Sequence, residues 1–171
     1  MRVFEDRYRL LFKKTQNLLY SRGAVEFVRL RNARFGPTQE APIPRILVVD
    51  DQDVVRRGVR QILETQDAWE VVGEALNGQE AIRLNQQLRP DAIVMDIAMP
   101  VMNGLDATDE IVKANPDSKV LIVTMYQGSG VCRAAQASGA RGLISKSGAA
   151  TELTPALKII IAGGTYFRLD S

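Results

Sequence analysis

The stretch DAIVMDIAMPVMNG, residues 91–104, decides the fold that we predict for this chain. Its apolar run 92–95 has the length and composition of a buried strand, and a proline bounds the run on either side. Asp96 follows directly, at the expected tip of this strand, and Asn103-Gly104 then predicts a turn. Chemistry in parallel α/β sheets collects at the carboxyl ends of strands, so Asp96 is a candidate site residue. A strand-end Asp is, however, more often a turn residue or a helix cap.

The composition excludes several classes of protein. The chain has 171 residues, 46% hydrophobic and 25% charged, which is typical of a globular domain of ordinary size with an extension. No apolar run approaches the roughly 18 residues that span a bilayer, and charged residues interrupt the N-terminus where a signal peptide needs an apolar core. One cysteine, Cys132, excludes an internal disulfide and favours a cytoplasmic location. Without histidine, Ser-His-Asp triads and histidine zinc sites are excluded.

The charge is unevenly distributed along the chain. Residues 1–44 contain nine Lys and Arg against four Asp and Glu, a net charge of +5, whereas residues 45–171 have a net charge of −3. Prolines cluster close to this change, so we predict a basic N-terminal extension with a Pro-containing linker over 1–44. A helix over about 4–20 is expected there. One interpretation is a helix that binds a partner or a membrane surface. We favour the other, in which this segment is a weakly structured extension or upstream sequence outside the working protein.

From residue 45 onward, short apolar runs alternate with helical patterns. Strands are expected at 46–49, 69–75, 92–95, 120–123 and 142–145, and helices at 54–65, 79–88, 107–114, 130–138 and 149–162. Five strands that alternate with five helices through short loops predict an α/β fold, with a parallel sheet covered on both faces.

Polar side chains follow four of the five expected strands. The second strand ends in Ala75-Leu76, and an order of 2-1-3-4-5 explains this gap by placing it at the sheet edge. We therefore predict a flavodoxin-like, doubly wound sheet whose switch point lies between strands one and three. The residues expected to meet at this edge are Asp50, Asp51, Asp96, Thr124 and Lys146.

This set of residues suits phosphoryl transfer. Three neighbouring carboxylates repel one another, and hard oxygen ligands favour Mg²⁺ as the cation that relieves the repulsion. One carboxylate can then act as a nucleophile and form an acyl phosphate. Lys146 can neutralise a phosphoryl oxygen, and the hydroxyl of Thr124 can donate a hydrogen bond to another.

The motifs ILVVDDQ, VMDIAMPVMNG, VLIVTMY and GARGLISKSG resemble those of response-regulator receiver domains of two-component signalling. The resemblance covers residues 45–167. TMY, GARGLISK and the closing AGGTYF are more narrowly similar to the NarL/FixJ-type subfamily, whose output is helix-turn-helix DNA binding.

The resemblance implies a role for each site residue. Asp96 is the phosphoacceptor, charged by a partner sensor histidine kinase. Asp51, Asp96 and the backbone carbonyl of Ala98 bind Mg²⁺ directly, and Asp50 acts through water. Thr124 and Lys146 bind the phosphoryl group and relay its arrival. The implied protein is a cytoplasmic signalling switch rather than an enzyme, and homodimer formation is left open.

Four positions depart from the family pattern. Receivers commonly have Tyr or Phe where this chain has Leu143, which puts an aromatic switch in doubt. Met125 is bulkier than the usual residue after the threonine. Ala98 and Tyr126 offer no carboxylate or amide to orient a water molecule, so we predict slow autodephosphorylation.

The end of the chain leaves the output open. Residues 168–171 form a short tail with no room for a helix-turn-helix domain, so the DNA-binding half is either removed from this chain or absent in a receiver-only protein; the subfamily features favour removal. Two rival functions remain. One is a pseudo-receiver that docks partners without phosphorylation. The other is an aspartyl hydrolase, which would need a second Asp where this chain has Ala98.

Overall fold

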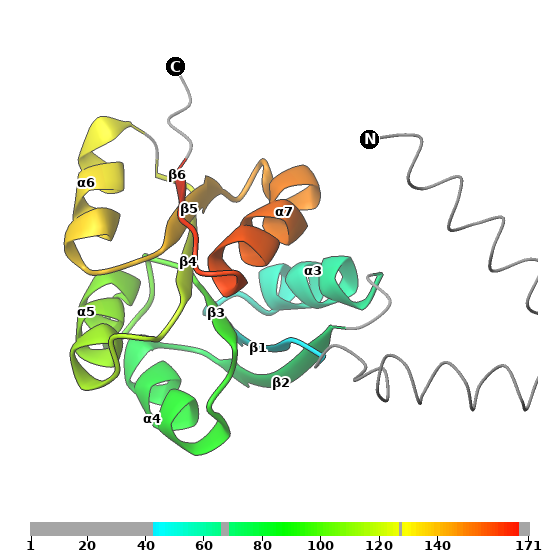
Figure 1. Cartoon of the computed structure of the whole chain (residues 1–171), viewed down its shortest axis with the longest axis horizontal. Coiled ribbons are helices and arrows are strands. Elements are labelled where there is room, and N and C mark those ends of the chain that lie inside the picture. The colour runs from blue at the N-terminus through cyan, green and yellow to red at the C-terminus, as the bar shows by residue number, and fades with distance from the viewer. Residues whose placement is uncertain (1–42, 66–68, 127, 168–171) are drawn as a thin grey trace, which may run out of the picture. The chain divides into compact units, whose positions relative to one another are not determined.

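The computed structural model describes residues 43–65, 69–126 and 128–167. Over these ranges the chain forms one parallel sheet in the order β2-β1-β3-β4-β5-β6 (Figure 1). The strands are β1 (Arg45–Val49), β2 (Glu70–Ala75), β3 (Ala92–Met95), β4 (Val120–Thr124), β5 (Gly142–Ser145) and β6 (Tyr166–Phe167). The predicted flavodoxin-like order 2-1-3-4-5 is confirmed. The helices between the strands are α3 (Asp53–Glu64), α4 (Gly78–Leu88), α5 (Gly104–Ala114), α6 (Ser129–Ala137) and α7 (Ala149–Ile161).

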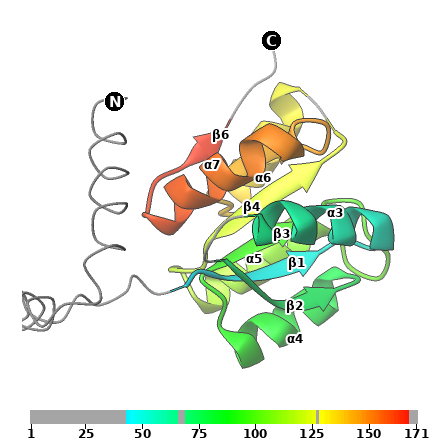
Figure 2. The ribbon, with the colours of Figure 1, turned by 90° about the vertical axis from the view of Figure 1, so that its right-hand side faces the viewer.

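Both faces of the sheet are buried by helices. Figure 1 shows α4, α5 and α6 on one side and α3 with α7 on the other, and Figure 2 shows α3 and α7 in front of the strands. The alternation of side chains along each strand produces this arrangement, since Leu47 and Val49 of β1 pack with the first helix layer and Ile46 and Val48 with the second. The central strands are therefore apolar on both faces, as continuous runs predict.

The predicted boundaries mostly lie within one residue of the observed ones, and two larger differences remain. Helix α5 begins three residues earlier than expected, because Asn103 caps it rather than only turning the chain: its Oδ1 accepts hydrogen bonds from the amides of Leu105 and Asp106, each at 2.9 Å. The strand β6 was not predicted, because two residues after Gly163-Gly164 carry no periodic signal. It pairs with β5 at Gly142 and Leu143.

The predicted extension 1–44 and its helix over 4–20 lie outside the described residues, apart from Ile43 and Pro44. Residues 168–171 of the predicted tail lie outside them too. Among the residues that the structure describes, no helix has both the length and the apolar character needed to cross a bilayer.

Candidate functional site

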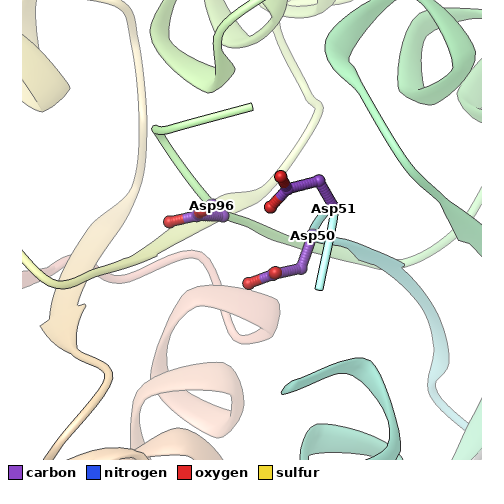
Figure 3. A group of neighbouring side chains, drawn as sticks. All are labelled: Asp50, Asp51 and Asp96. Carbon is purple, nitrogen blue, oxygen red and sulfur yellow. The ribbon is translucent and has the colours of Figure 1, made fainter. Parts of the chain in front are cut away.

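Three carboxylates converge at the carboxyl ends of β1 and β3. These strands are neighbours in the sheet, with Val49 in register with Met95, so the residues that follow them emerge side by side. One carboxylate oxygen from each of Asp50, Asp51 and Asp96 lies within 4.8 Å of the others. Figure 3 shows the three side chains extending in the same direction from adjacent strand ends. Asp50 and Asp96 are buried, whereas Asp51 is exposed at the mouth of the cluster.

Lys146 reaches the same cluster from the end of β5. Its Nζ lies 2.7 Å from Oδ2 of Asp50 and 3.1 Å from Oδ2 of Asp96, and its side chain is 10% exposed. The ammonium group therefore bridges an acid of β1 and an acid of β3. Four of the five predicted strand-end residues thus come together in one site.

Burial and charge set the ionisation of this site. Burial raises the pKa of Asp96 above its ordinary value, and the hydrogen bond and charge of Lys146 offset this only in part. Burial disfavours the charged form of Lys146, but its hydrogen bonds and charge interactions with Asp50 and Asp96 outweigh this and raise its pKa. Lys146 is therefore held as a cation against a carboxylate whose charge is costly to bury.

The backbone around Asp96 is tightly packed. The Asp96 amide donates to the carbonyl of Val49 at 2.9 Å, which fixes the end of β3 to β1. The first turn of α5 passes directly over this point, because a Cβ on Gly104 would lie 1.8 Å from the Asp96 carbonyl oxygen. Gly104 is therefore required by close packing beside the site, where the sequence predicted only a turn.

Thr124 and Ala98 complete the predicted set. Thr124 is the fully buried last residue of β4, in register with Ser145, and its Oγ1 accepts a hydrogen bond from the amide of Tyr126 at 3.2 Å. It therefore ends its strand at the same edge as Asp96 and Lys146. Ala98 lies exposed in the loop between β3 and α5, two residues after Asp96.

The acidic cluster fits Mg²⁺ in its donor chemistry and its spread. Mg²⁺ binds oxygen ligands at about 2.1 Å in an octahedron, so its ligands lie at most roughly 4.2 Å apart. The three carboxylate oxygens, all within 4.8 Å of one another, have a comparable spread. Within the described ranges, no other group of His, Cys, Asp and Glu has this geometry.

One residue close to the cluster was missed by the sequence analysis. The guanidinium of Arg56, on α3, is buried and donates to the backbone carbonyl of Asp50 at 3.0 Å. Arg56 also pairs with Glu74 of β2. The available signal was Arg56 and Arg60 at i and i+4 on one helix face, together with a Glu inside an apolar strand.

The departures from the family pattern have distinct environments. Leu143 is buried and in register with Phe167 of β6, so the sheet edge beside it is covered by an aromatic residue from the unpredicted strand. Met125 and Tyr126 are exposed by 71% and 57%, respectively.

Comparison with known proteins agrees with this geometry. Residues 46–158 match the response regulator receiver domain family. The chain belongs to this family. The receiver is 36% identical over 122 residues to the response regulator GacA of Pseudomonas viridiflava and 40% identical over 123 residues to the oxygen regulatory protein NreC of Staphylococcus carnosus. Each match covers 71% of this chain and 57% of the relative, so this chain spans little more than half the length of these relatives.

A solved structure agrees with this family assignment. A two-component response regulator of the LuxR family from Aurantimonas sp. SI85-9A1 superimposes with a TM-score of 0.70 and 38% identity, over 72% of this chain and 88% of that one. The resemblance to receivers of transcription regulators is thus confirmed.

Proposed function

We propose that this receiver is a phosphorylation-activated switch, in which Asp96 accepts a phosphoryl group from a sensor histidine kinase. The observation that carries this proposal is the position of Lys146, whose ammonium group contacts Asp50 and Asp96 at once. A purely structural lysine would need only one partner at a strand end. This lysine instead faces both the proposed cation site and the proposed nucleophile.

The residues divide the chemistry among them. A carboxylate oxygen of Asp96 attacks the phosphorus, the bond from phosphorus to the kinase's imidazole nitrogen breaks, and the Asp96 acyl phosphate forms. Asp51, Asp96 and the Ala98 carbonyl would hold Mg²⁺, with Asp50 acting through water; when bound, the ion neutralises charge on the transferring group. Lys146 moves from Asp50 and Asp96 to a phosphoryl oxygen, and the Thr124 hydroxyl donates to another.

The output of the switch follows from the new contacts of Thr124 and Lys146. Thr124 ends β4 and Lys146 directly follows β5, so their movement toward the phosphoryl group shifts the adjoining surface and its partner preference. A transcriptional role would be exerted through a DNA-binding domain outside residues 45–167, as the kinship with LuxR-family regulators suggests. We place this switch in the cytoplasm and assign it no turnover of its own.

Beryllofluoride, which mimics an aspartyl phosphate, tests this proposal. The whole chain is titrated with Mg²⁺ and beryllofluoride while amide chemical shifts and oligomeric state are followed. Shifts around β3, β4 and β5 are expected in the wild type and in Asp109→Asn, a control that removes a half-exposed carboxylate paired with Lys113. Asp96→Asn abolishes them.

Two other outcomes would overturn the proposal. If beryllofluoride leaves the spectrum unchanged, the chain is a pseudo-receiver that acts as an interaction module. If the chain hydrolyses phosphate esters with turnover that requires Asp96, it is an aspartyl hydrolase.

A further inference from the structure

Arg56 is a buried cation beside the acidic cluster, and its guanidinium hydrogen bonds go to other groups than the carboxylates of Asp50, Asp51 and Asp96. Its side chain is 10% exposed, and the three nitrogens of its guanidinium have three different acceptors. Nη1 donates to the backbone carbonyl of Asp50 at 3.0 Å, Nη2 to Oδ1 of Asp53 at 3.1 Å, and Nε to Oε2 of Glu74 at 3.0 Å. Arg56 thereby joins the end of β1 to α3 and β2.

Glu74, the acceptor of Arg56 on β2, is itself held in place by Arg60. Glu74 lies on β2 in register with Val48, and its other carboxylate oxygen accepts two hydrogen bonds from Arg60. The hydrogen bond from Arg60 is the main reason that the pKa of Glu74 lies below its ordinary value, so Glu74 stays ionised and keeps its hold on Arg56. The guanidinium is thus fixed at both ends.

The bond to Asp50 has a consequence for Asp51. The carbonyl that Arg56 holds belongs to the peptide unit linking Asp50 to Asp51, and a peptide unit is planar and rigid. Asp50 is further held through its amide, which donates to Ala75, and through Oδ1, which accepts from the amide of Gln52. Fixing this peptide plane sets the direction in which the exposed Asp51 side chain leaves the backbone.

We propose that Arg56 is a positioning residue for the cation site, which orients the Asp50–Asp51 peptide so that Asp51 presents its carboxylate to Mg²⁺. This inference rests on the proposed function only in that the acids bind Mg²⁺. Removing a group that orients a metal ligand commonly weakens metal binding 10–100-fold. The guanidinium of Arg56 is such a group, because it holds the peptide that carries Asp51.

The direction in which Mg²⁺ affinity changes when Arg56 is replaced distinguishes a positioning role from a purely electrostatic one. Removing a nearby positive charge lowers repulsion of the cation, so a purely electrostatic role predicts tighter Mg²⁺ binding in Arg56→Met. A positioning role predicts weaker binding, because the peptide plane is released.

The experiment measures the Mg²⁺ dissociation constant of the whole chain by calorimetry and by amide shifts, with no phosphodonor present. Arg57→Ala is the matched control, since Arg57 directly follows Arg56 on the same helix and also pairs with Asp53, yet its side chain is 73% exposed. Arg56→Lys keeps the charge and one donor, and thermal unfolding without Mg²⁺ shows that each variant is folded.

We expect Arg56→Met to bind Mg²⁺ about tenfold more weakly or worse, Arg56→Lys to recover part of the loss, and Arg57→Ala to match the wild type. If Arg56→Met does not fold, Glu74→Gln, which loosens the anchored end, is expected to weaken binding while Arg57→Ala does not. Equal or tighter binding in the folded Arg56 and Glu74 variants overturns the positioning role but leaves the cation site standing. Absence of Mg²⁺ binding in the wild type overturns both.

Discussion

Replacing Gly104 by alanine would displace the proposed phosphoacceptor without altering any side chain of the site. The new Cβ would lie 1.8 Å from the Asp96 carbonyl oxygen, 2.8 Å from its carbonyl carbon and 2.9 Å from Cγ of Met95. Non-bonded heavy atoms are most stable at about 3.5 Å, so the start of α5 and the end of β3 would have to separate by roughly 1.5 Å.

The cost of this separation follows from what must move. Two backbone segments are involved rather than a flexible side chain, and overpacking of a rigid site costs typically 1–3 kcal/mol. We expect a loss of about 3 kcal/mol, which lowers the melting temperature of a domain of this size by about 10 °C. A misplacement of about 1 Å can slow a positioned reaction up to about 100-fold, and we expect phosphoryl uptake by Asp96 to fall toward that limit.

Urea denaturation measures the loss of stability, and the rate of phosphoryl uptake measures the displacement of Asp96. Gly58→Ala is the control, and it is expected to raise stability rather than lower it. Gly58 lies in α3 and a Cβ there meets nothing within 4 Å, so alanine should stabilise the helix by about 0.5–1 kcal/mol and leave uptake unchanged. Wild-type stability and uptake in Gly104→Ala would refute the packing argument.

Two further predictions concern acid stability and the lifetime of the phosphorylated state. Glu74 has a lowered pKa, chiefly through its hydrogen bond from Arg60, so its contribution to stability is present above the unfolded value of about 4.3 and is lost as the pH falls through the lower folded value. Denaturant midpoints between about pH 5 and 3 should therefore fall more steeply in the wild type than in Glu74→Gln, and parallel curves would contradict this. Ala98 and Tyr126 are both exposed and supply no carboxylate or amide, so the phosphorylated state should last minutes or longer in a phosphate-release assay, and a half-life of seconds would show another group activating water.

Much of the fold follows from the sequence because continuous apolar runs and helical patterns alternate strongly. The central strands are buried on both faces, which is typical of a parallel sheet covered by helices on each side. The meeting of Asp50, Asp51, Asp96 and Lys146 was predictable for the same reason, since each follows a strand of one sheet. Because the strands are parallel, their carboxyl ends lie at one edge of the sheet, and these residues meet there.

The features that the sequence did not predict depend on tertiary contacts. The strand β6 forms at Tyr166–Phe167 because the edge of β5 accepts a close neighbour at Gly142, where a Cβ would lie 2.7 Å from the Tyr166 carbonyl oxygen. The close packing at Gly104 and the buried fork of Arg56 likewise involve partners distant in the chain. The i, i+4 spacing of Arg56 and Arg60 hints at a shared helix face, but it does not reveal that Arg56 is buried against Asp50 and Glu74.

A crystal structure of the chain grown with Mg²⁺ and beryllofluoride tests the proposed switch most directly. We expect beryllium bonded to a carboxylate oxygen of Asp96, a cation in contact with Asp51, Asp96 and the Ala98 carbonyl, and Lys146 turned from Asp50 toward a fluoride. A cation bound elsewhere, or an unmodified Asp96 with Lys146 still bridging the two acids, would contradict it.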